Sequence, residues 1–257
     1  MQKLISIDLK SDFGFFRKPD ANNTINLSYN MLHKPGLLGI LGAIIGLEGY
    51  KEKCKFPQYY ERLKNLNIGI EPLDHEKGNF QKTVIKYSNT VGYANNGSNY
   101  LTEEATLIKP SFRIYLELNL ENADHHKIYN YLKEGKAEFI PYFGKNEFQI
   151  WWEKESFNEY EFEKIEENNN SYRISSLFTI DENEPPAIDF GLEESVRKRN
   201  PELGQPYIYF ERLPSCFEEN LIQYRLDKFV FSNYLFKNEL TPSNLFKLAQ
   251  SKYVQLH

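Results

Sequence analysis

Two basic residues stand directly before a glycine-rich apolar segment. His33 and Lys34 precede Pro35, which suits the first position of a helix. Four glycines then follow at spacings that place them on one helical face: Gly36, Gly39, Gly42 and Gly46. The first N–H groups of a helix and the positive end of its dipole attract anions. A phosphate would therefore fit beside His33 and Lys34.

The bare glycine face has two interpretations. Each glycine inside a helix costs about 1 kcal/mol relative to alanine, so the pattern indicates that some backbone approaches this helix closely. The approaching group can be a ligand, or the helix can simply pack tightly on a sheet or another helix. The spacing alone does not choose between them.

The composition restricts the class of protein. The 257 residues are 40% hydrophobic and 15% aromatic, enough for a core in one large or two small domains. There are 36 acidic and 31 basic residues and a net charge of -5, so any polyanion site must be a local patch. Cys54 and Cys216 lack metal-ligand spacing and suit a reducing cytoplasm. The start lacks a signal-peptide pattern and residues 35–47 are too short to cross a bilayer, so we expect a soluble cytoplasmic chain.

Residues 1–150 contain the clearest periodicity. Alternation predicts strands over residues 4–9 and 112–120, and a weaker signal predicts one near residues 68–70. The glycine helix, a short helix or connection at 56–66 and a helix over 127–134 lie between or after them, with Asp124 as N-cap and Gly135 at the end of the last helix. A β-prone run at 82–93 and a turn at 95–99 predict a projecting hairpin. This order favours an α+β fold.

The second half is harder to interpret. Residues 148–152 are strand-like, and an acidic stretch up to residue 170 suggests a surface excursion. Short β-prone pieces follow at 172–180 and 207–213, with a possible helix at 192–200. Residues 151–257 therefore form an expected extension that packs on residues 1–150.

Three patterns in order carry a family resemblance. They are Ser28-Tyr29 with the glycine segment 34–46, the segment 102–115, and Tyr131-Leu132-Lys133-Glu134-Gly135 leading to Pro141-Tyr142-Phe143-Gly144-Lys145. Together they resemble the fifth Cas protein family, the RAMP-superfamily subunit of type I CRISPR surveillance complexes, and most of all subtype I-B. The resemblance covers residues 1–150.

The resemblance implies a ferredoxin-like, RRM-like core, a β-hairpin thumb at residues 77–105 and a β-rich C-terminal extension. It also implies a non-catalytic subunit without cofactor or metal that binds and caps the 5′ handle of the crRNA. Its partners would be the backbone subunit of the seventh Cas family and the large subunit of the eighth. Target DNA would be met indirectly, because guide pairing reads it.

Single-stranded RNA is held by cations on phosphates and by flat side chains on bases. On this basis the candidate RNA contacts are Phe15, Arg17, Lys18, Tyr29, His33, Lys34, Gly36, Gly39, Gly42, Lys86, Tyr87, Tyr93, Lys109, Arg113 and Lys145. Each also has a structural interpretation. Phe15 and Tyr29 can belong to the core, Lys86 and Arg113 can face water, and Lys145 can cap a strand.

Two alternative functions remain open. One branch of the resembling family, in subtype I-C, cleaves precursor RNA without metal, which implies acid–base work by histidine, tyrosine and lysine. Tyr29, His33 and Lys34 supply these types, and His125-His126 form a second, more simply solvent-facing pair. The other alternative is a ferredoxin-like protein-interaction domain that does not bind RNA.

Overall fold

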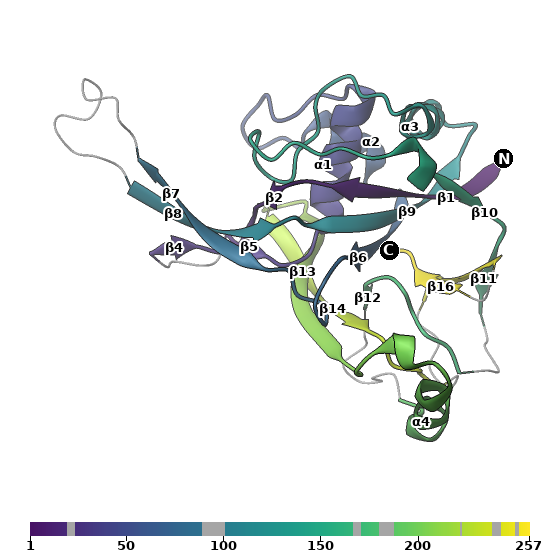
Figure 1. Cartoon of the computed structure of the whole chain (residues 1–257). Coiled ribbons are helices and arrows are strands. Elements are labelled where there is room, and N and C mark those ends of the chain that lie inside the picture. The colour runs from purple at the N-terminus through teal and green to yellow at the C-terminus, as the bar shows by residue number, and fades with distance from the viewer. Residues whose placement is uncertain are drawn as a thin grey trace.

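A four-stranded antiparallel sheet organises the first part of the computed structural model (Figure 1). Its strand order is β10 (Asn158–Tyr160), β1 (Gln2–Lys10), β9 (Ser111–Asn119) and β6 (Asn67–Leu73). The structure describes residues 1–19, 24–88, 101–166, 171–179, 188–221, 223–237, 243–249 and 252–257. The strands predicted at residues 4–9, 68–70 and 112–120 are all present in this sheet.

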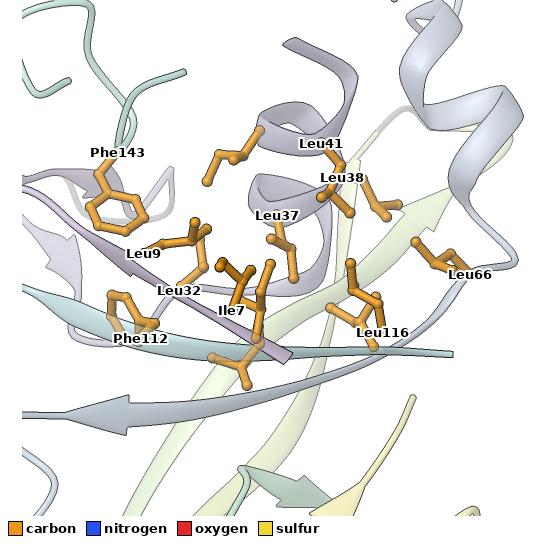
Figure 2. Packing of buried hydrophobic residues seen from close by; sticks show 14 of the residues in the cluster. Ile7, Leu9, Leu32, Leu37, Leu38, Leu41, Leu66, Phe112, Leu116 and Phe143 are labelled. Atoms are coloured by element: carbon orange, nitrogen blue, oxygen red, sulfur yellow. The ribbon is translucent and has the colours of Figure 1, made fainter. Parts of the chain in front are cut away.

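Three helices cover one face of the sheet: α1 (Lys34–Ile45), α2 (Gln58–Leu63) and α3 (Ala123–Glu134). Every second residue of β1 and β9 points toward them, as period-two alternation requires. Ile7 and Leu9 of β1, Phe112 and Leu116 of β9, and Leu37 of α1 are fully buried in one cluster (Figure 2). This layer is the main core, and it fixes the position of α1 on the sheet.

The opposite face of the sheet is also covered. Leu4 of β1 and Tyr115 of β9 are fully buried against strands β15 (Leu245–Leu248) and β16 (Lys252–Gln255). Strand β11 (Phe162–Ile165) pairs with β15 and completes this layer. The central sheet therefore offers no open face to a ligand over the residues that the structure describes.

Strands β7 (Lys82–Ser88) and β8 (Leu101–Ile108) form an antiparallel pair that extends away from the helices (Figure 1). Short strands lie beside its base: β2 (Phe13–Gly14), β4 (Ile25–Asn26), β3 (Phe16–Arg17) and β5 (Ser28–Tyr29). The predicted turn at residues 95–99 and Tyr93 lie outside the described residues.

The C-terminal part adds a further three-stranded sheet of β12 (Phe178–Thr179), β14 (Gln223–Ser232) and β13 (Ile208–Glu218). Helix α4 (Phe190–Arg199) and the 3-10 turns η1 (Lys154–Ser156) and η2 (Pro201–Leu203) complete the elements. The N–H of Leu177 donates to the carbonyl of Ile70 at 2.7 Å, and the N–H of Phe217 donates to the Tyr60 hydroxyl at 2.9 Å. These contacts join the two parts of the chain.

The mixed α and β content predicted from the sequence is confirmed. Three local predictions are wrong. Residues 148–152 form only isolated bridges, Trp151 with Lys10 and Gln149 with Tyr142. The acidic stretch supplies strands β10 and β11, and Asn122 rather than Asp124 caps α3. The division at residue 150 remains a prediction, although β10 lies beyond it and pairs with β1.

Within the described ranges, every helix is too short or too polar to span a lipid bilayer. The same residues contain no group of three or more His, Cys, Asp or Glu side chains arranged to hold a metal ion. Cys54 is exposed and Cys216 is half-buried, and neither forms a disulfide.

Candidate nucleic-acid interface

A groove with a volume of about 920 Å³ runs beside the glycine face of α1. It brings together six of the residues singled out in the sequence: Phe15, Arg17, His33, Gly36, Gly39 and Lys145. They come from strand β3 and the residue before it, from the start of α1, and from the loop after α3. Residues far apart in the chain therefore form one surface.

Aromatic side chains supply much of the rest of the groove. Tyr50, Phe139 and Tyr142 line it and are 58%, 59% and 41% exposed. Tyr59 lines it beside them, and burial is the main cause that raises the pKa of its hydroxyl far above the ordinary range. Exposed rings in a concave surface are suited to stacking on bases, with about 1–3 kcal/mol gained per base.

The start of α1 differs from the predicted phosphate site. His33 is the N-cap, and its Nδ1 accepts a hydrogen bond from the N–H of Gly36 at 3.2 Å. Pro35 has no N–H, so the first turn of the helix keeps few free donors for an anion. Burial lowers the pKa of His33 to about 3. Its imidazole is therefore neutral near pH 7 and attracts no phosphate by charge.

Lys34 and Tyr29 do not line the groove. The Lys34 ammonium donates to the backbone carbonyl of His257 at 2.9 Å, and burial lowers its pKa to about 8. Tyr29 is 2% exposed, and the Lys18 ammonium lies 5.0 Å from the centre of its ring. Lys18 also pairs with Glu211 at 2.9 Å. Lys34, Tyr29 and Lys18 therefore make contacts within the protein and join the region of the groove to other parts of the fold.

The glycine stripe packs mainly against α2. A Cβ added at Gly42 would lie 2.4 Å from Tyr59 Cβ, whereas one at Gly39 would lie 3.6 Å from the Tyr59 ring. Gly46 ends the helix with φ 82°. Tight helix packing thus explains Gly42, a left-handed cap explains Gly46, and Gly36 and Gly39 remain in the wall of the groove.

Lys145 lies where the loop after α3 meets the β7–β8 pair. Its Nζ is 2.7 Å from a carboxylate oxygen of Glu104 and 4.0 Å from the centre of the Tyr87 ring. Gly144, with φ 83°, permits this approach, because a Cβ there would lie 1.9 Å from the carbonyl oxygen of Phe15. Lys86, by contrast, is 72% exposed and pairs with Glu103 at 2.7 Å.

Arg113 and Lys109 do not line the groove beside α1. The Arg113 guanidinium makes two hydrogen bonds to the Asp8 carboxylate, at 2.7 and 2.8 Å, on the face of the sheet that the C-terminal strands cover. Arg113 therefore belongs to a structural ion pair, and a contact of this arginine with RNA stays a prediction. Lys109 is exposed in the turn between β8 and β9, where its φ is 46°.

Several residues of the groove were missed in the sequence. Tyr50 and Phe139 lie in irregular segments, where periodicity carries no information, and Tyr59 lies in α2, which is too short to show a period. Glu104 alternates in β8 like any solvent-facing residue. Tyr142 belongs to the segment Pro141-Tyr142-Phe143-Gly144-Lys145, and the family resemblance of that segment was the sequence signal that could have identified it.

No protein-family model matches the sequence, and no curated protein matches it. Solved structures do resemble its fold. A chain of the Type III-B Cmr-beta complex bound to cognate target RNA and AMPPnP has a TM-score of 0.51 and 13% identity, with 99% of each chain covered.

Two further structures are a CRISPR protein from Archaeoglobus fulgidus and a chain of a CRISPR RNA-guided surveillance complex. The first has a TM-score of 0.49 and 12% identity, covering 98% of this chain and 97% of that one. The second has a TM-score of 0.47 and 9% identity, covering 93% and 94%. At these identities the likeness concerns the fold. As the sequence resemblance predicted, this chain is similar in fold to CRISPR-associated proteins.

Proposed function

We propose that the protein is a non-catalytic subunit of a type I CRISPR surveillance complex, of subtype I-B, that binds and caps the 5′ handle of the crRNA. The observation that carries this proposal is the groove beside α1. It combines Arg17, which is exposed and has no ion-pair partner among the described residues, with exposed rings and a glycine wall. Cations for phosphates and rings for bases are what single-stranded RNA requires.

The architecture supports the RAMP assignment. The element order β1, α1, β6, β9, α3, β10 and the strand order β10-β1-β9-β6 match a βαββαβ ferredoxin-like core. We assign the β7–β8 pair to the thumb that meets a backbone subunit of the seventh Cas family. Residues 151–257 would form the C-terminal extension, apart from β10, which supplies the fourth strand of the core.

The remaining partners follow from the same proposal. We propose that the large subunit of the eighth Cas family lies beside this chain. This chain would meet the target DNA only indirectly, since base pairing with the guide RNA reads the sequence of the DNA. The complex would act in the cytoplasm.

The environment of the candidate acid–base groups supports a role without catalysis. His33 is buried and neutral, and its Nδ1 is occupied by the N–H of Gly36. Tyr29 is buried, and Lys34 is bonded to the carbonyl of His257. A general base must reach its proton within hydrogen-bond distance, and none of the three lies free in the groove.

The test is to incubate the purified chain, in chelator, with labelled RNA carrying a CRISPR repeat and its 5′ handle. Native and denaturing gels then report binding and cleavage separately. We expect retained, intact RNA for the wild type and weaker retention for Arg17→Gln. Arg199→Gln is the matched control, because Arg199 is an exposed arginine on α4, far from α1 (Figure 1).

Two outcomes would overturn the proposal. Cleavage at one position, lost in His33→Ala, would make the chain a metal-independent endoribonuclease. Absence of RNA binding at low salt would leave a protein-interaction domain.

A further inference from the structure

The charges that line the groove are not equivalent. Three cations and two carboxylates face it: Arg17, Lys51, Lys145, Glu48 and Glu104. Lys51 pairs with Glu48, and Lys145 pairs with Glu104. Among the described residues Arg17 has no such partner. The net positive charge of the groove is therefore the charge of Arg17.

The Lys145–Glu104 pair is partly shielded from water. The Lys145 side chain is 24% exposed and the Glu104 side chain 11%, with the Tyr87 ring packed against the ammonium. Desolvation lowers the pKa of Lys145, but the hydrogen bond and the charge of Glu104 raise it more, and the net shift is upward. Lys145 is therefore a cation near pH 7, and its salt bridge to Glu104 makes the pair neutral as a whole.

Hydrogen-bonding capacity remains on both members of the pair. Glu104 uses Oε2 for Lys145, and its Oε1 has no partner among the described residues. The ammonium has three donors, of which one points to Glu104 and one is used by Tyr87, so one donor remains. The pair therefore presents an acceptor beside a donor at the wall of an aromatic groove.

This arrangement is unsuited to phosphate, because a phosphate near Lys145 would also lie near the Glu104 carboxylate, and like charges repel. The edge of a nucleobase is neutral and carries donors and acceptors side by side. We propose that the Lys145–Glu104 pair binds the hydrogen-bonding edge of an unpaired base, while Arg17 binds a phosphate. This inference rests on the proposed RNA binding and assigns different roles to two charged sites in the same groove.

The experiment compares a single-stranded oligoribonucleotide with its abasic ribose-phosphate counterpart of equal length. Both carry the same phosphates, so the ratio of their affinities isolates the contribution of the bases. Binding is measured over a salt series for the full-length wild type, Arg17→Gln, Lys145→Met and Glu104→Gln. Circular dichroism and a melting curve check that each variant is folded.

We expect different variants to change two quantities: the slope of the logarithm of the binding constant against the logarithm of the salt concentration (the salt slope), and the preference for RNA with bases. Arg17→Gln should flatten the slope by about 0.7, the value for one phosphate contact on a single strand, and leave the base preference unchanged. Lys145→Met should leave the slope unchanged and reduce the base preference by about 5- to 150-fold, as for one base contact. Glu104→Gln should also reduce the preference, and its freed ammonium should steepen the slope.

The opposite results would overturn the inference. If Lys145→Met flattens the slope as Arg17→Gln does, Lys145 is a second phosphate contact, and if it changes neither quantity, the pair does not touch RNA. In both cases the wild type still binds RNA and the proposed function stands. Failure of the wild type to bind either oligonucleotide would instead overturn the proposed function. If Glu104→Gln does not fold, the comparison of Arg17→Gln with Lys145→Met still decides.

Discussion

The imidazole of His33 is buried at the N-terminus of α1, where its Nδ1 accepts a hydrogen bond from the N–H of Gly36. His257 is half-buried against the ring of Phe229, and its Nδ1 is shielded from water. Desolvation is the main cause that lowers the pKa of both histidines to about 3, from an ordinary value of 6.5. At the residue scale, burial therefore turns groups that could titrate near neutral pH into neutral structural groups.

This predicts a loss of stability in acid. Below pH 6.5 the unfolded chain binds protons at His33 and His257 that the native chain does not bind until the pH approaches 3, so the free energy of unfolding is largest near pH 7 and falls on acidification. We expect a loss of about 2 kcal/mol per histidine between pH 7 and pH 5. Urea unfolding at the two pH values measures it.

His33→Asn is the matched variant, because asparagine is also a good N-cap. Its loss between pH 7 and pH 5 should be smaller than that of the wild type by about 2 kcal/mol, since His257 remains and burial also lowers the pKa of His75 and His125. An equal loss in the variant and the wild type would show that His33 does not cause the pH dependence.

At the element scale, α1 and α2 meet through a glycine face that is tight at one end and roomier at the other. The added Cβ would be 2.4 Å from Tyr59 Cβ at Gly42 but 3.6 Å from the Tyr59 ring at Gly39. The first distance forces a backbone shift, whereas the second is ordinary contact. The two glycines therefore form a natural pair of test positions.

We expect Gly42→Ala to lower the free energy of unfolding by about 1–3 kcal/mol, the usual cost of overpacking. Gly39→Ala should leave it unchanged or raise it by up to about 1 kcal/mol, because alanine favours helix. Denaturant unfolding of both variants measures this. Equal destabilisation would contradict the packing explanation of the stripe.

The pairing of β1 with β9 gives a second prediction at this scale. Arg113 bonds Asp8 across these strands through two contacts, beneath the C-terminal strands. Arg113→Met leaves a shielded carboxylate unpaired and should lower the free energy of unfolding by about 1–3 kcal/mol. RNA affinity of the folded variant should stay at the wild-type level, and a specific loss of RNA binding would return Arg113 to the interface.

At the scale of the whole molecule, the C-terminal strands complete the burial of the central sheet. Val254 of β16 is fully buried in a cluster with Leu4 and Tyr115, and the backbones of Ile68 and His257 exchange two hydrogen bonds at 2.9 and 3.1 Å. We therefore expect the two parts of the chain to unfold together.

Val254→Asp tests this coupling. A buried, unpaired carboxylate should lower the free energy of unfolding by about 3 kcal/mol or more. The indole of Trp152, which donates to the carbonyl of Leu132 at 3.1 Å, reports on the region around α3. The fluorescence of Trp152 and its neighbour Trp151 and the far-UV circular dichroism should shift together in denaturant. An unchanged fluorescence transition would show that the two parts unfold independently.

The sequence by itself determined the elements whose residues repeat with a regular period. Ile5, Ile7 and Leu9 alternate in β1, and the run from Phe112 to Leu120 alternates in β9, because each strand has one face toward the helices. Gly135 ends α3 with φ 66°, a backbone conformation that glycine adopts without strain. Local geometry decides such features, so local sequence is enough to predict them. The order of motifs also predicted the fold that the chain shares with CRISPR-associated proteins.

Only the tertiary structure decided which candidates share a surface. The fold places Phe15, Arg17, Gly36, Gly39 and Lys145 around one groove, and it holds other candidate residues in contacts outside that groove. The partners responsible are distant in the chain: Asp8 for Arg113, His257 for Lys34 and Tyr59 for Gly42. A side chain becomes a ligand contact or a structural contact according to what packs against it. Contacts between distant segments leave no periodic signal in a single sequence.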